Sequence, residues 1–137
     1  MAVVSELIRT EANGSISFGD YTRSAKAKLD HFQHQGDEYK VKTFKEITKL
    51  ERNGMFVYES VPGTTVLGFT QDEGKVAFDV EGPEDAQITL ELAEATEYAI
   101  CVNGEAVGTF KTNLGGKLTL GVELEGGKTA SVQVTKQ

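Results

Sequence analysis

The sequence is poor in the residues that build disulfide or metal-bound frameworks. It has one cysteine, Cys101, so it cannot form an intrachain disulfide. Cys101 alternates with Ile100 and Val102, a pattern typical of a small apolar residue in a strand. The two histidines, His31 and His34, would share a face on a helix but point to opposite faces of a strand. We therefore expect no metal site and no cofactor.

Long apolar runs and positive charge are also scarce. No window approaches the ~18 apolar residues of a membrane span, and no basic, apolar leader begins the chain. We therefore expect a cytoplasmic protein with no membrane partner. The 137 residues include 14 Lys and Arg against 21 Asp and Glu, for a formal net charge of −7. This balance disfavours nucleic acid as a partner, because phosphates require a basic surface.

The charge is unevenly distributed along the chain. Residues 1–62 hold nine basic and nine acidic side chains, whereas residues 63–137 hold five lysines and twelve acidic side chains. Such asymmetry suits a head-to-tail contact between copies of the chain, although an acidic face also serves solubility alone.

Catalytic motifs are missing from the sequence as well. It contains no Gly-x-Ser-x-Gly elbow, P-loop, Cys-His pair or His-Glu-x-x-His segment. The acidic pairs Asp72-Glu73 and Glu84-Asp85 could offer oxygen ligands to Ca²⁺, but no EF-hand spacing surrounds them. We therefore expect a protein that is not an enzyme, and we assign no catalytic, cofactor-binding or metal-ligating residue.

Glycine turns are the most regular feature that the sequence does contain. The pairs Asn13-Gly14, Asn53-Gly54 and Asn103-Gly104 each lie between segments with strand-like composition. A type I′ turn needs positive φ at both central residues, which Asn and Gly tolerate best, so each pair predicts a tight antiparallel hairpin. Gly115-Gly116 and Gly126-Gly127 predict two further turns of the same kind.

Alternating polarity extends the pattern of strands through the first half of the chain. Residues 26–31 and 39–43 alternate between polar and apolar side chains on either side of a polar turn at 33–37. This period of two predicts a pair of half-buried strands. The apolar residues 55–58 do not alternate, which predicts a strand buried on both faces.

One segment of the first half permits two interpretations. Residues 43–46 fit a helix capping box, and the apolar side chains of the residues 44–52 fall at helical spacing. Residues 47–60 also form a good hairpin around Asn53-Gly54. We favour the strand, with a turn or bulge near residues 44–46.

Regular strand spacing continues from residue 65 to the end of the chain. The break at residues 61–64 contains Pro and Gly, which predicts a boundary between a hairpin region, 1–62, and a second region, 65–137. Seven short strands separated by turns predict a seven-stranded sandwich of immunoglobulin-like or fibronectin-like type. The expected strands are 65–70, 75–80, 86–92, 97–102, 105–111, 117–124 and 131–136. The expected fold is therefore all-β, with antiparallel N-terminal hairpins packed against this sandwich.

Two resemblances accompany this pattern. Residues 98–110 and 115–118 resemble the end of small β-sandwich modules on carbohydrate-active and cell-surface proteins, which implies a fold but no activity. Residues 18–21, 39–47 and 50–64 resemble a family of small bacterial proteins, some of which carry an "endosialidase β chain" label. That label implies an accessory role in glycan processing. No residue of the chain matches the Arg, Glu and His constellation of an endosialidase active site, so no catalytic residue is transferred.

Aromatic residues concentrate in the first half of the chain, interleaved with Lys and Arg. They could form a plain core, a protein interface or a surface on which sugars stack. Together with Met55, they make up the candidate interface: Phe18, Tyr21, Phe32, Tyr39, Phe44, Met55, Phe56 and Tyr58.

The function expected from the sequence is structural or interactive. Each half of the chain is small for an independent core, which favours packing between the halves or formation of a homo-oligomer. We expect self-association or docking of a protein partner. The first alternative is a carbohydrate-binding or accessory module, and the second is a small hydrolase that uses paired carboxylates.

Overall fold

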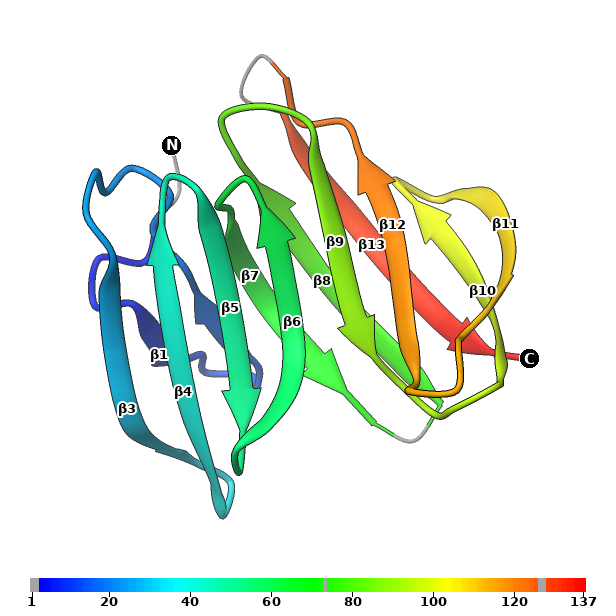
Figure 1. Cartoon of the computed structure of the whole chain (residues 1–137), viewed down its shortest axis with the longest axis horizontal. Helices are drawn as coiled ribbons and strands as arrows, with labels where there is room; N and C mark the ends of the chain where they lie inside the picture. The colour runs from blue at the N-terminus through cyan, green and yellow to red at the C-terminus, as the bar shows by residue number, and fades with distance from the viewer. Residues whose placement is uncertain (1–2, 73, 126–127) are drawn as a thin grey trace.

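A computed structural model of the protein describes residues 3–72, 74–125 and 128–137. In these ranges the chain forms thirteen strands and no helix (Figure 1). They are β1 (Ile8–Thr10), β2 (Ile16–Phe18), β3 (Ala27–His34), β4 (Asp37–Phe44), β5 (Ile47–Arg52), β6 (Met55–Val61), β7 (Thr65–Gln71), β8 (Lys75–Glu81), β9 (Ala86–Glu91), β10 (Glu97–Val102), β11 (Glu105–Lys111), β12 (Lys117–Val122) and β13 (Thr129–Lys136). The all-β fold expected from the sequence is confirmed.

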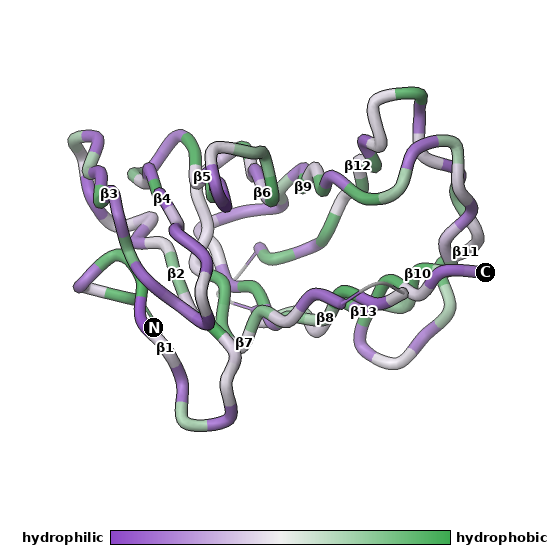
Figure 2. Tube along the Cα trace, turned by 90° about the horizontal axis from the view of Figure 1, so that it is seen from below, coloured by the Kyte–Doolittle hydropathy of each residue, from purple (hydrophilic) through white to green (hydrophobic). Residues whose placement is uncertain are grey.

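The strands form two antiparallel sheets that stack in a sandwich-like arrangement. Sheet A has the order β1-β2-β7-β8-β13-β10-β11, and sheet B has the order β12-β9-β6-β5-β4-β3. Figure 2 shows the two sheets as separate layers. Along each strand, side chains that face the other sheet alternate with side chains that face outward, as the period of two in the sequence predicts.

Both sheets contain strands from both halves of the chain. In sheet A, β2 pairs with β7, and in sheet B, β6 pairs with β9. The boundary expected at residues 61–64 falls where the chain leaves sheet B at the end of β6 and enters sheet A at β7. The regions 1–62 and 65–137 are therefore interleaved in two shared sheets.

A cluster of four aromatic rings lies in the middle of the core. The ring of Phe18 lies edge-on to Tyr58 at 5.3 Å between centroids and to Phe69 at 5.9 Å. Phe78 completes the cluster, edge-on to Tyr58 and stacked on Phe69, at 5.7 Å from each. Two of these residues come from each half of the chain and all four are buried, so a single core serves both halves.

Two of the predicted hairpin turns are confirmed, and two others differ. Both residues of Asn53-Gly54 and of Asn103-Gly104 have positive φ, as a type I′ turn requires. At Asn13-Gly14 only the glycine has positive φ, and residues 11–15 form a longer loop in which Asn13 Oδ1 accepts hydrogen bonds from Ser15. At Gly115-Gly116 only Gly116 has positive φ, and the turn leads from β11 of sheet A to β12 of sheet B, so it is not a hairpin turn. The pair Gln35-Gly36 forms a further turn with positive φ at both residues, between β3 and β4. The predicted turn at Gly126-Gly127 lies outside the described residues.

The ambiguous segment near Phe44 is a strand. β4 ends at Phe44, Lys45 and Glu46 form a turn, and β5 begins at Ile47. β5 pairs with β4 on one side and β6 on the other. The preference for strand over helix is confirmed, because pairing on both edges outweighs the local capping signal.

Candidate functional site

The aromatic residues expected at an interface divide between the core and the surface. Phe18, Tyr21, Tyr39 and Tyr58 are buried. Phe32, Phe44 and Phe56 are half-buried, and Met55 is 64% exposed. The eight residues therefore do not share one surface, and only the second group can contact a partner without a change in the core.

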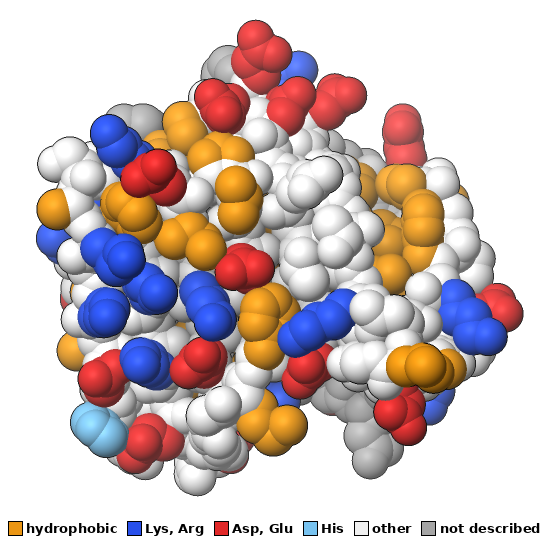
Figure 3. Space-filling model, in the orientation of Figure 1, with side chains coloured by type: hydrophobic (Ala, Val, Ile, Leu, Met, Phe, Trp, Pro, Cys, Tyr) orange, Lys and Arg blue, Asp and Glu red, His pale blue; other side chains and the backbone are white. Residues whose placement is uncertain are grey.

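Lysines line the outer face of sheet B, on strands that the sequence already marked as alternating. Lys28 of β3 lies directly opposite Lys42 of β4, and Lys42 lies directly opposite Lys49 of β5. Val41 and Leu50, their neighbours in β4 and β5, are buried on the inner face. We call the outward set Lys26, Lys28, Lys40, Lys42 and Lys49 the lysine face. Figure 3 shows these blue side chains gathered over β3, β4 and β5.

The lysine face carries an electrostatic cost. Like charges at directly opposite positions of neighbouring strands destabilise a sheet. The charge of Lys26, followed by burial and the charges of Lys28, Lys49 and Lys40, lowers the pKa of Lys42 below its ordinary value. The positive charges are therefore close enough to repel one another in the folded protein.

Few carboxylates offset this charge. Lys49 Nζ lies 3.5 Å from Glu51 Oε2. Within the described ranges, Lys28, Lys40 and Lys42 have no ion-pair partner. With Lys49 and Glu51, these three lysines line a shallow depression of about 170 Å³. The arrangement suits an anionic group placed above the sheet.

An acidic surface lies at another part of the molecule. The loop between β8 and β9 carries Glu84 and Asp85, and the segment after β12 carries Glu123 and Glu125, all exposed. The two loops are joined, because Asp85 Oδ1 accepts hydrogen bonds from the backbone nitrogens of Leu124 and Glu125, at 2.9 and 3.1 Å. We call these four acidic residues the acidic end; Figure 3 shows red side chains there, above β9 and β12.

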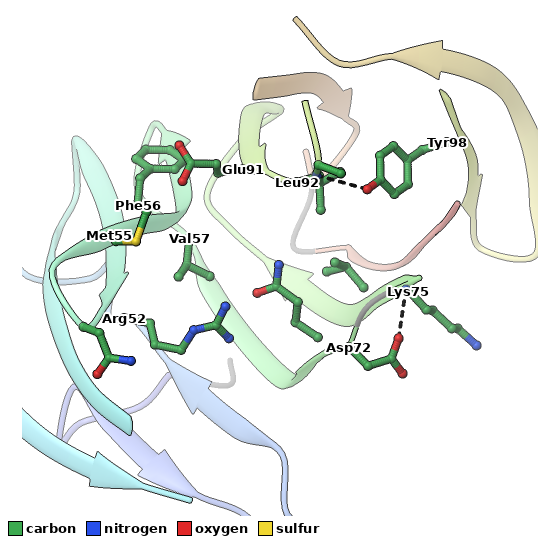
Figure 4. Close-up of a pocket in the computed structure, with 13 residues that line it drawn as sticks. Arg52, Met55, Phe56, Val57, Asp72, Lys75, Glu91, Leu92 and Tyr98 are labelled. Atoms are coloured by element: carbon green, nitrogen blue, oxygen red, sulfur yellow. Dashed lines mark hydrogen bonds between the residues drawn. The ribbon is translucent and has the colours of Figure 1, made fainter. Parts of the chain in front are cut away.

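A cleft opens between the sheets at the opposite end of the strands. Its volume is about 270 Å³, and its lining residues come from the ends of β5, β6, β7, β8, β9 and β10 and from the adjoining loops (Figure 4). Phe56, Arg52 and Lys75 line it, and Lys117 Nζ lies 3.7 Å from the centre of the Phe56 ring. Among the described residues neither Arg52 nor Lys75 has an ion-pair partner. The cleft therefore combines apolar residues of β6 with one cation, Arg52, because the side chain of Lys75 points away from the cavity in Figure 4.

The two carboxylates of this cleft, Asp72 and Glu91, already interact with other groups of the protein. Asp72 Oδ1 accepts hydrogen bonds from the backbone nitrogens of Gly74 and Lys75, and Glu91 Oε1 pairs with Lys117 Nζ at 2.8 Å. Each carboxylate therefore holds local structure. In the part of the chain that the structure describes, no group of three potential metal ligands occurs. Glu73 of the acidic pair considered for Ca²⁺ lies outside that part.

The two histidines occupy different environments. Nε2 of the buried His34 donates to the Gly14 carbonyl at 3.0 Å, which leaves Nδ1 to accept from the Thr10 hydroxyl at 3.0 Å. His31 is exposed, has positive φ in a bulge of β3, and contacts Glu38 at 3.0 Å. His34 therefore joins the β1–β2 hairpin to the tip of β3. Cys101 is a half-buried free thiol.

Sequence reasoning missed the lysine face, although its signal is visible. Lys40 and Lys42 alternate with buried residues in β4, and Lys49 does the same in β5. Period two places each lysine on an outer face, but only the register of the strands shows that they face one another.

These features define an antiparallel β-sandwich protein with a basic outer face and an acidic end. Comparison of the chain with protein-family models, with curated proteins and with solved structures gave no match. The residues that the structure describes include no helix that could cross a membrane.

Proposed function

We propose that the protein is a non-enzymatic assembly protein, in which the lysine face of one copy docks on the acidic end of the next. The observation that carries the proposal is the row Lys28, Lys42 and Lys49, opposite one another on three neighbouring strands. Such a row costs stability in the isolated chain. Carboxylates of a second copy, placed opposite these lysines, would attract them and so offset the repulsion.

The acidic end is the natural counterpart of the lysine face. Residues 63–137 carry twelve acidic side chains against five lysines, and the four carboxylates of the acidic end lie on two adjoining loops. The two surfaces lie on different parts of the chain, so their contact is head to tail. A head-to-tail contact repeats from copy to copy and produces a ring or an open filament.

Light scattering coupled to gel filtration tests the proposal. We expect oligomers at micromolar concentration in low salt, and their dissociation as ionic strength rises to about 0.5 M, where the screening length is only ~4 Å. The double variant Lys28→Glu, Lys42→Glu is expected to remain monomeric in low salt. The matched control, Lys111→Glu with Lys136→Glu, makes the same change of charge at exposed positions outside both surfaces.

A charge-swap experiment identifies the counterpart surface. The variant Glu123→Lys, Glu125→Lys is also expected to be monomeric alone. Mixed with Lys28→Glu, Lys42→Glu, it is expected to form a complex, because the reversed surfaces attract each other again. A strict monomer in low salt that also captures nothing from a cell lysate contradicts the proposal. Capture that is lost in the lysine-face variant indicates an acidic protein partner in place of a second copy.

The end cleft supports a second candidate function, the binding of an acidic sugar. Arg52 lines the cleft together with the apolar side chains of Met55, Phe56 and Val57, and these groups offer charge to the carboxylate of a sugar and apolar contact to its ring. A glycan array with the wild-type protein and the Phe56→Ala and Arg52→Ala variants tests this candidate. Absence of binding by the wild type, or equal binding by all three proteins, excludes the cleft as a sugar site.

A further inference from the structure

At one end of the sandwich, sheet A extends beyond the last strand of sheet B. Sheet A has seven strands and ends at β11, whereas sheet B has six and ends at β12. Figure 1 shows β10 and β11 lying beyond β12. The inner face of β11 therefore has no strand of sheet B across from it.

The strand register shows which side chains this overhang uncovers. Tyr98 and Ile100 of β10 are buried in the core, and they lie directly opposite Phe110 and Gly108 of β11. Phe110 thus belongs to the inner face, like Tyr98. It is nevertheless 40% exposed, and Val107, at the bulge of the same strand, is 55% exposed.

Apolar side chains continue from β11 to the edge of sheet B. Val102 of β10 and Leu120 of β12 pack against the core but are only partly buried. We call Val102, Val107, Phe110 and Leu120, together with the free edge of β12, the edge notch. Figure 3 shows hydrophobic side chains gathered between β12 and β11.

The edge of β12 lacks the features that usually protect an edge strand. From Leu118 to Val122 it contains no charged residue, no proline and no bulge in its pairing with β9. In contrast, β3 carries Lys28 and Asp30 and is bulged, and β11 is bulged against β10. Unprotected edges are sites where another chain can add a strand.

The overhang excludes one arrangement, the symmetric pairing of two copies of this protein through their β12 edges. Two β12 edges paired antiparallel about a two-fold axis would join the two copies of sheet B into one continuous sheet. In that arrangement the two copies of β11 would compete for the same space in the facing layer, because sheet A extends beyond β12 in each copy.

We propose that the edge notch binds an extended segment of another protein as an additional strand of sheet B. About six residues would match the length of β12. Apolar side chains at every second position would cover Phe110 and Leu120, and the backbone would pair with the free edge of β12. This surface is separate from the lysine face, so the proposal does not depend on the proposed assembly.

Selection from a displayed library of random octapeptides tests the notch. We expect enriched peptides to alternate apolar and polar residues, and to bind the Val107→Ser, Phe110→Ser variant at least about tenfold more weakly than the wild type. Both side chains are exposed, so the variant is expected to keep the fold, as checked by its melting temperature. Val61→Ser, at a position 56% exposed on β6, is the matched control.

Backbone methylation of an enriched peptide tests the strand geometry. Successive N–H groups of a strand point to opposite edges, so methylation at alternate residues blocks one edge at a time. We expect one methylated peptide to lose binding and its counterpart, methylated at the other set, to retain it. Equal effects of both peptides would overturn the proposal, as would a library that yields no peptide dependent on Phe110 and Val107.

Discussion

At the residue scale, a buried chain of hydroxyl groups joins sheet B to Thr64, in the connection between β6 and β7. Thr48 Oγ1 donates to the Thr64 carbonyl at 2.8 Å and accepts from the Thr64 backbone nitrogen at 3.0 Å. Because this uses the one hydroxyl proton of Thr48, Thr43 must donate to Thr48, across 2.8 Å. Thr64 Oγ1 in turn contacts Tyr58 and Ser60.

Thr48 is therefore the most sensitive member of this chain. We expect Thr48→Val to lower the free energy of unfolding by about 1–3 kcal/mol, because it leaves the buried N–H and carbonyl of Thr64 without partners. Thr48→Ser keeps the hydroxyl and is expected to lose much less. Urea denaturation of both variants measures the difference; a loss in Thr48→Ser as large as that in Thr48→Val would contradict a dominant role of the hydroxyl.

Tyr21 connects the first half of the chain to β8. Its hydroxyl donates to Glu81 Oε2 at 3.0 Å, and burial, together with this carboxylate, raises the pKa of Tyr21 to about 12. A raised pKa in the folded state means that the stabilisation is present below pH 10 and lost as the pH rises through about 12.

Alkaline denaturation tests this assignment. We expect the wild type to lose more stability than Tyr21→Phe between pH 10 and 12, because the variant has no phenol to ionise. Tyr39→Phe removes a hydroxyl from another buried tyrosine and serves as the control. Parallel pH profiles for the wild type and Tyr21→Phe would contradict the proposed contribution of Tyr21.

At the element scale, the positive charges on β3, β4 and β5 lower the stability of the folded protein. The lowered pKa of Lys42 means that its protonated form is disfavoured in the folded state, so the lysine face costs stability at neutral pH. We expect Lys42→Gln to raise the free energy of unfolding by about 0.5 kcal/mol, the scale of cross-strand pairs. The same variant is expected to weaken self-association.

A Lys42→Gln variant that is more stable but associates more weakly than the wild type would show that the lysine face serves association. Lys111→Gln, on the exposed strand β11, is expected to alter neither quantity by a measurable amount. Thermal denaturation and light scattering on the three proteins provide the comparison. A Lys42→Gln variant that is less stable than the wild type would show that this lysine serves the fold rather than a partner.

At the scale of the whole molecule, the two halves of the chain depend on each other. Without residues 1–64, sheet B would be reduced to β9 and β12, and Phe69 and Phe78 would lose their ring contacts with Phe18 and Tyr58. We expect a fragment of residues 65–137 to show the narrow amide dispersion of an unfolded chain in NMR spectra. Addition of a fragment of residues 1–64 is expected to restore the dispersed spectrum. A folded fragment would show that the second half forms its own domain.

Local chemistry accounts for the parts of the fold that the sequence made predictable. Asn53-Gly54 and Asn103-Gly104 determine their turns, because few other residues accept positive φ at both positions. Alternation of polarity in β4 and β9 determines which side chains face the core. These signals depend on residues two to four positions apart, so they can be read from the sequence without knowledge of the fold.

Contacts between distant segments determined the rest. Apolar and aromatic composition marked Phe18, Tyr21, Tyr39 and Tyr58 as notable, but only the stacking of the sheets placed them in the core. The lysine row, the edge notch and the end cleft depend on strand order and register, which join residues far apart in the chain. The sequence by itself therefore determined the strands and turns, because these are local. Their pairing required the tertiary structure, because it is decided by burial of the whole core at once.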